Sequence, residues 1–133
     1  MSILIRIATL AGPYAGIGAL VLGLLHWFFN ISFIELHILF GAVVTLSLLA
    51  AGIVALSRRG LRGLGLLSVV FAPVVPIFGM AQANLLVGGF HWVIRIAHLL
   101  VGAAAIALTE RIGGRFAEVS AQDPSATDEA RAA

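Results

Sequence analysis

Four long apolar segments constrain this chain more than any other feature of its sequence. They cover roughly 4–28, 35–57, 64–84 and 90–110, and each reaches the roughly 20 residues that a helix needs to cross a bilayer core. Backbone polar groups in lipid must be satisfied inside their own segment, so each segment is predicted to be helical. Short connections favour neighbouring antiparallel helices. The sequence therefore predicts an all-α, four-helix transmembrane bundle with up-down-up-down topology.

Composition supports this class. Of the 133 residues, 61% are hydrophobic and only 11% are charged, which is more apolar surface than a soluble domain of this length can bury. Residues 1–113 form the predicted transmembrane domain, and the polar stretch 114–133 is predicted to be a disordered cytoplasmic tail. Pro73 and Pro76 in the third segment predict a bend there.

The arginines predict the orientation of the bundle. Those near the membrane boundary on one side are Arg6, Arg58, Arg59, Arg62, Arg111 and Arg115. The loops on the other side, at 29–34 and 85–89, contain no basic residue. The positive-inside rule then places both termini in the cytoplasm. We expect an integral protein of the bacterial cytoplasmic (inner) membrane, whose other two loops face the periplasm.

Several function classes are excluded by what the sequence lacks. Without cysteine there can be no disulfide, no cysteine-ligated iron–sulfur cluster and no covalently attached c-type haem. The sequence has no phosphate-binding loop, dinucleotide fingerprint or nucleophile elbow. The sequence pI near 10.5 comes from few charges, and no nucleic-acid partner is expected.

Four histidines lie in the outer half of the expected bundle. His26 ends the first span, His37 begins the second, His91 begins the fourth, and His98 lies about two turns deeper. Three different helices thus bring imidazoles to one side of the membrane. Interfacial histidines are often simple hydrogen-bonding residues, but an ionisable residue at the depth of His98 is a functional candidate by default.

A polar stripe on the fourth span suggests where these side chains point. His91, Arg95, His98 and Gly102 share one helix face by their spacing. Arg95 facing lipid would cost about 2.5–3.5 kcal/mol near mid-membrane, so the stripe is predicted to face the bundle interior. Glu35 is the acidic residue near this boundary and is the expected charge partner of Arg95.

Imidazoles in such a place can bind haem iron, copper or zinc, or relay protons. One or two haem b groups would use His98 with His37 or His26. Arg95 would pair with the propionates, and His91 would lie near them or bind a second iron. Gly41 and Gly102, one turn below His37 and His98, would make room for a flat ligand or for close helix packing.

Three alternatives remain open from the residues alone. One is a metal site for copper, zinc or iron built from His26, His37, His91 and His98. Another is a proton-coupled transporter that uses the His–Arg–Glu cluster as a relay and needs an oligomer. The third is a structural or assembly subunit of a larger membrane complex, whose buried polar residues fix helix register.

Two stretches, LHILFGAVVTLSLLAAGIVALSRRGLR at 36–62 and AHLLVGAAAIAL at 97–108, resemble the bacterial cytochrome b561-type membrane cytochromes. That resemblance implies a four-helix electron carrier that binds haem b, reacts with quinone and serves a periplasmic redox partner. It makes His37 and His98 haem ligands. The family carries two haems, one toward each face, but no histidine here lies in the inner half. One haem near the outer face, or two close together, fits this chain better.

Overall fold

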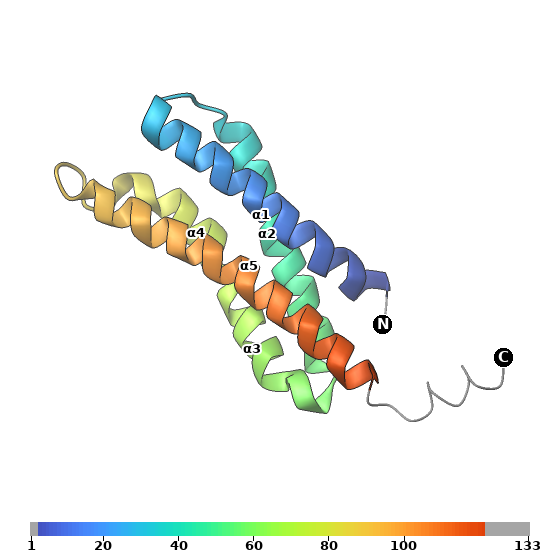
Figure 1. The fold of residues 1–133 in the computed structure, drawn as a ribbon. Helices are drawn as coiled ribbons and strands as arrows, with labels where there is room; N and C mark the ends of the chain where they lie inside the picture. The colour runs from blue at the N-terminus through green and yellow to red at the C-terminus, as the bar shows by residue number, and fades with distance from the viewer. Residues whose placement is uncertain (1–2, 122–133) are drawn as a thin grey trace, which may run out of the picture.

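A computed structural model describes residues 3–121, and within them four helical spans cross the length of the molecule (Figure 1). The first two are α1 (Ile3–Phe29) and α2 (Ile34–Leu56), and the last is α5 (His91–Ala121). The third consists of the 3-10 turn η1 (Arg59–Leu61), α3 (Arg62–Phe71), α4 (Val74–Ala81) and η2 (Gln82–Asn84). All four spans are long and apolar enough to cross a membrane.

The predicted fold class is confirmed: the bundle is all-α across the described residues, and successive spans alternate in direction. Ile3 and Ala121 consequently lie at the same end of the bundle (Figure 1). We call this the arginine end and the opposite one, which carries the loops at 30–33 and 85–90, the histidine end. The chain is an integral membrane protein by the length and composition of these helices.

The predicted bend in the third span is confirmed as a break between α3 and α4. Ala72 still donates its backbone N–H to the carbonyl of Ser68 at 2.9 Å, whereas Pro73 has no N–H to continue the series. Helical bonding resumes when the N–H of Ile77 donates to the carbonyl of Pro73 at 3.2 Å. Pro76 falls in the first turn of α4, where backbone N–H groups have no intrahelical acceptor, so its missing N–H costs the helix no hydrogen bond.

The fourth span extends further than the sequence suggested. α5 continues to Ala121, so residues 114–121, placed in the disordered tail, are helical; residues 122–133 lie outside the described part. Two interactions explain the extension. Phe116 is buried in the core, and Arg115 pairs with Glu118 at 3.0 Å, one helical turn later.

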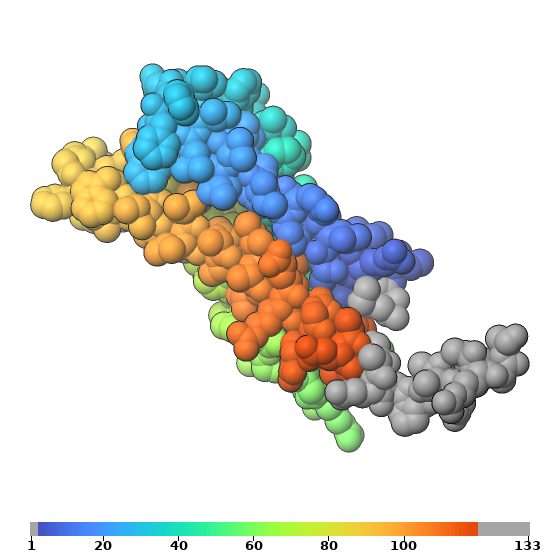
Figure 2. Space-filling model, in the orientation of Figure 1, coloured from blue at the N-terminus to red at the C-terminus, as the bar shows by residue number. Residues whose placement is uncertain are grey.

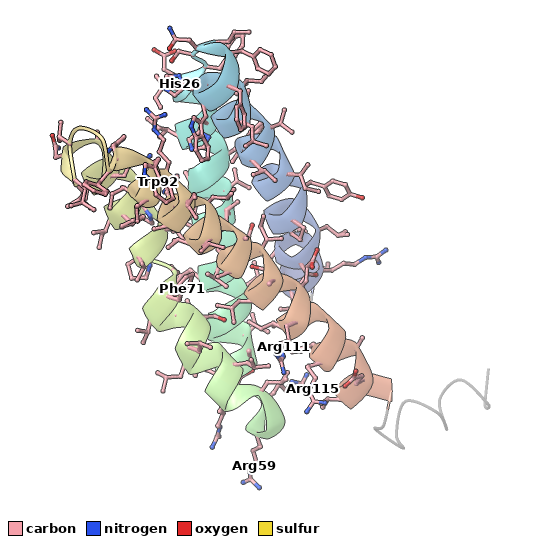
Figure 3. All side chains as sticks on the ribbon, turned by 60° about the vertical axis from the view of Figure 1, so that its left-hand side comes forward. His26, Arg59, Phe71, Trp92, Arg111 and Arg115 are labelled. Atoms are coloured by element: carbon pink, nitrogen blue, oxygen red, sulfur yellow. The ribbon has the colours of Figure 1, made fainter. Side chains whose placement is uncertain are left out.

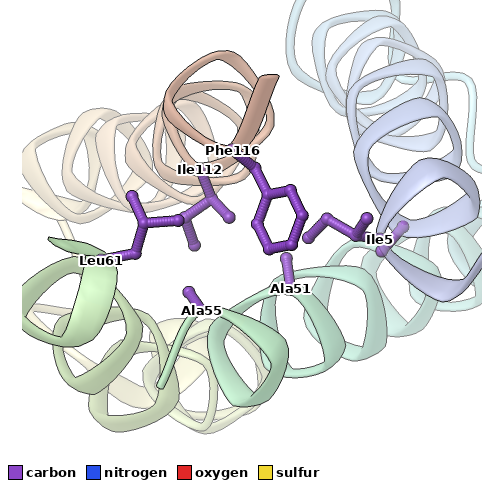
Figure 4. Packing of buried hydrophobic residues seen from close by; sticks show 7 residues of the cluster. Ile5, Ala51, Ala55, Leu61, Ile112 and Phe116 are labelled. Carbon is purple, nitrogen blue, oxygen red and sulfur yellow. The ribbon is translucent and has the colours of Figure 1, made fainter. Parts of the chain in front are cut away.

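The buried core occupies only part of the bundle. One cluster, at the arginine end, joins Ile5, Ala51, Leu61, Ile112 and Phe116 from four parts of the chain (Figure 4). A second lies toward mid-bundle, where its buried members are Ala15, Val44, Leu48, Ala72, Val75 and Ala105. These small and branched side chains let the four spans approach closely in lipid.

The histidine end is not closed in the same way. Among residues 3–121, no residue is buried in α1 beyond Gly16, in α2 before Val44, in α4 beyond Val75 or in α5 before Ala105. The pair α1 and α2 and the pair α4 and α5 diverge toward their loops (Figure 1), and the loops form separate projections in the space-filling view (Figure 2). The buried core therefore ends about halfway along the bundle, and toward the histidine end the two pairs meet through partly buried side chains such as His37 and His98.

Candidate functional site

The structure brings together two of the four histidines, His37 on α2 and His98 on α5. Their ring centroids are 6.0 Å apart, and their planes are inclined by 48°. Both residues are half-buried, and both lie in the open half of the bundle. The prediction that the stripe of α5 faces the bundle interior is thus met at His98 but not at Arg95, which is exposed. His37 rather than His26 is the residue opposite His98.

A hydrogen bond to the backbone orients His37. Its Nδ1 lies 2.9 Å from the carbonyl oxygen of Ala19 on α1. The carbonyl can only accept, so Nδ1 donates, and the lone pair of the neutral ring is on Nε2. The ring also lies beside Gly23, where a Cβ would be in ordinary van der Waals contact, 3.4 Å from Cε1 of His37. Histidines that ligate metals commonly show this pattern, in which a backbone carbonyl fixes the tautomer.

His98 is held by α4 on its other side. Its ring stacks on Phe78 at a centroid distance of 6.0 Å and an angle of 28°, and a Cβ at Gly79 would lie 3.3 Å from its Cε1. Nδ1 of His98 is buried and has no hydrogen-bond partner within the described residues. An unpaired polar atom in such surroundings costs free energy unless a group outside the described residues forms a hydrogen bond with it.

Open space adjoins a glycine one turn along the helix from each histidine. Gly41 follows His37 by one turn and Gly102 follows His98 by one turn, so each glycine shares its histidine's helix face. A Cβ built at either position meets no atom within 4 Å. Both glycines are half-buried. A flat group could therefore approach either backbone closely.

Arg95 lies one turn outward from His98 and reaches across to α1. Its guanidinium carbon is 5.9 Å from the centroid of the Trp27 ring, which is a cation–π contact. The prediction that Arg95 forms an ion pair with Glu35 is wrong. Within residues 3–121 the one salt bridge that forms joins Arg115 to Glu118. Arg95 faces α1, whereas Glu35 lies in the first turn of α2. The charge of Arg95 is thus available to an anion on the side of the site that faces the histidine end.

The other two histidines do not join this pair. His91 donates its Nδ1–H within its own end of the chain, to the carbonyl oxygen of Leu85 in the preceding loop at 3.1 Å. His26 is exposed near the end of α1 at the histidine end (Figure 3). Within the described residues, no group of three or more histidine or acidic side chains is close enough together to hold a metal ion. The four-histidine metal site is therefore not assembled in this structure.

Sequence reasoning missed several contacts of the site. Phe78 and Gly79 pack on His98, and the carbonyl of Ala19 orients His37, yet none of these was a candidate. A histidine-containing stripe on one helix gives no information about which neighbour covers it. Gly23 could have been found from the sequence, since it shares a face of the first span with the small residues Gly12, Gly16 and Ala19.

Comparisons of this chain with protein-family models, with curated proteins and with solved structures each gave no match.

Proposed function

We propose that this protein is a membrane b-type cytochrome that holds one haem b between His37 and His98, near one face of the bilayer. The observation that carries the proposal is the facing pair of imidazoles from α2 and α5. When bound, the haem iron supplies one-electron transfer. His37 and His98 would hold the group, Gly41 and Gly102 would leave room for its ring, and Arg95 would place a positive charge near it.

The separation of the two rings fits bis-histidine ligation. Nitrogen–metal bonds of about 2.0–2.1 Å, added to about 1.2 Å from nitrogen to ring centre on each side, give centroids about 6.5 Å apart, so the rings would need to separate by about half an ångström. The observed separation is 6.0 Å. The hydrogen bond from Nδ1 of His37 to Ala19 leaves Nε2 free to coordinate and makes it a more basic ligand.

The free space beside the two glycines supports the same proposal and can be tested directly. We expect Gly41→Phe and Gly102→Phe to reduce the haem content of the purified protein about tenfold, because each phenyl ring would occupy volume that a porphyrin needs. The helical fold should persist, since a Cβ meets no atom within 4 Å at either site. Pyridine haemochrome content per protein measures the effect. Gly114→Phe at the arginine end, also without a neighbour within 4 Å, is the control.

Arg95 is placed to pair with the propionates of the bound group. We expect Arg95→Gln to lower the midpoint potential of the bound haem by tens of millivolts, because a nearby positive charge favours the reduced, more negative state. For one electron, about 59 mV corresponds to a tenfold change in the equilibrium constant. Arg95→Lys should retain most of the potential. Potentiometric titration measures the shift. An equal shift in Arg115→Gln, at the far end of α5, would contradict this role for Arg95.

The wider role follows from the position of the pair. A quinone within the bilayer and a periplasmic redox partner are the electron donor and acceptor that we propose, with the termini and the arginine end in the cytoplasm of a bacterial inner membrane. The absence of histidine from the inner half of the described residues favours a single site near the outer face. We propose that the chain works as a subunit of a larger membrane complex or as a homo-oligomer.

A reduced-minus-oxidised spectrum of the purified protein tests the proposal. We expect a sharp α band and a Soret shift of a low-spin, six-coordinate b-type haem after dithionite reduction. A colourless protein that fails to take up added haemin would overturn it. If elemental analysis of that colourless protein showed stoichiometric copper or zinc, the same pair of histidines would instead be part of a metal site.

A further inference from the structure

We propose that the arginine end of the bundle is a binding site for the phosphate headgroups of anionic phospholipids. Of the seven arginines in residues 3–121, six lie at this end, and all six are exposed: Arg6, Arg58, Arg59, Arg62, Arg111 and Arg115. Figure 3 shows Arg59, Arg111 and Arg115 together at this end, opposite His26 and Trp92. This proposal does not depend on what His37 and His98 bind.

The charge of this end is largely uncompensated within the described residues. Only Glu110 and Glu118 supply negative charge there, and the one ion pair formed joins Glu118 to Arg115 at 3.0 Å. Both partners of that pair are more than half exposed, so it is weak. Five guanidinium groups therefore remain without an acidic partner in the part of the chain that the structure describes.

Packing places these arginines at the level of the bilayer headgroups. Leu61, in the short connection that follows α2, packs in one buried cluster with Ile112 and Phe116 of α5. The 23 residues of α2 span about 34 Å, close to the hydrocarbon thickness of about 30 Å, so the connection after α2 lies at the membrane boundary. Arg111 and Arg115 flank Ile112 on α5 and thus lie at the same depth as Arg58 and Arg62.

One contact ties the two parts of the site together. The guanidinium carbon of Arg58 is 5.1 Å from the centroid of the Phe116 ring, so the connection after α2 folds onto α5. Arg58 of the connection therefore lies against the same part of α5 that carries Arg111 and Arg115. Guanidinium groups bind phosphate oxygens in pairs of parallel hydrogen bonds, which suits a cluster of this kind to phosphodiesters.

Apolar side chains beside the arginines favour a lipid over a soluble anion. Leu4 and Ile7 flank Arg6 and are 53% and 58% exposed, and Leu66, one turn after Arg62, is 59% exposed. Ile7 and Leu66 follow Arg6 and Arg62 toward the middle of the bundle, so acyl chains beneath a bound headgroup would contact them. A molecule with a phosphate at the boundary and acyl chains beneath it would contact both. Basic residues at this position attract anionic headgroups in general.

Native mass spectrometry can measure the preference. The protein in neutral detergent is given equal amounts of phosphatidylglycerol and phosphatidylcholine with identical acyl chains. We expect about a tenfold preference for phosphatidylglycerol, and a loss of most of it in the triple variant R58Q/R62Q/R111Q. The matched control R95Q, which removes an arginine at the histidine end, should leave the preference unchanged.

Further measurements distinguish a headgroup site from a misfolded variant and from a site for free phosphate. The triple variant with lysine at the same positions should keep most of the preference, which shows that lost binding is not lost folding. Added salt should weaken binding of the anionic lipid by the wild type, whereas millimolar inorganic phosphate should not displace it. Equal retention of both lipids by the wild type, or an equal loss of preference in R95Q, would overturn the proposal.

Discussion

Replacing His98 with alanine is expected to abolish the low-spin haem spectrum of the purified protein. If His98 and His37 are the two axial ligands, the substitution removes one nitrogen from the iron and also the ring that stacks on Phe78. We expect the haem content to fall at least tenfold, a loss of about 1.4 kcal/mol or more in binding free energy. The remaining haem should be five-coordinate and high-spin. His37→Ala should behave in the same way, and absorption spectra of the oxidised and reduced protein measure both variants.

Two comparisons separate a ligand from a merely structural histidine. His26 is exposed and lies away from the pair, so His26→Ala should retain the full wild-type spectrum. Added imidazole should restore six-coordinate, low-spin haem in His98→Gly, because a free imidazole can occupy the space left by the side chain. The proposal is wrong if His26→Ala loses as much haem as His98→Ala does, or if His98→Ala keeps the wild-type spectrum.

The second large effect is expected at Gly65, where α3 crosses α2 with the backbones in contact. A Cβ at Gly65 would lie 2.7 Å from the backbone nitrogen of Leu56 and 2.8 Å from the carbonyl oxygen of Gly52. Backbone atoms of a packed helix cannot move aside as a flexible side chain can. Gly65→Ala should therefore force the helices apart and lower the free energy of unfolding by about 1–3 kcal/mol, and Gly65→Val should cost more.

Gly63 offers a matched control on the same helix. A Cβ at Gly63 meets no atom within 4 Å, and alanine is a better helix former than glycine. Gly63→Ala should therefore unfold at the wild-type temperature or slightly above it, while Gly65→Ala unfolds at a lower one. Thermal unfolding in detergent, followed by circular dichroism, measures both. Equal midpoints for the two variants would show that the close approach of α2 and α3 contributes little.

The spans could be predicted from the sequence because hydropathy and helix length are read along the chain. The expected segments 4–28 and 35–57 differ from α1 and α2 by one residue at each end. Proline chemistry likewise predicted the bend in the third span at Pro73. The end of α5 was missed by eleven residues, because the burial of Phe116 that supports its last turns depends on Ile5 and Leu61, which are distant in the sequence.

The candidate site could be predicted only in part. Sequence placed four histidines in one half of the bundle and pointed the stripe of the last helix inward. It left open whether His26 or His37 faces His98, and it assigned Arg95 the wrong neighbour. The structure pairs His98 with His37 and places Arg95 on Trp27. These contacts depend on the rotation of each helix about its own axis, which hydropathy along a segment does not specify.

The sequence by itself thus determined that this protein is a membrane bundle of four helices, because lipid forces long apolar segments to satisfy their backbone hydrogen bonds internally. Only the tertiary structure decided which imidazoles meet, where the core ends and which space stays open. Those features follow from close contacts between helices, such as that of Gly52 with Gly65, which fix how the spans cross and how far they diverge.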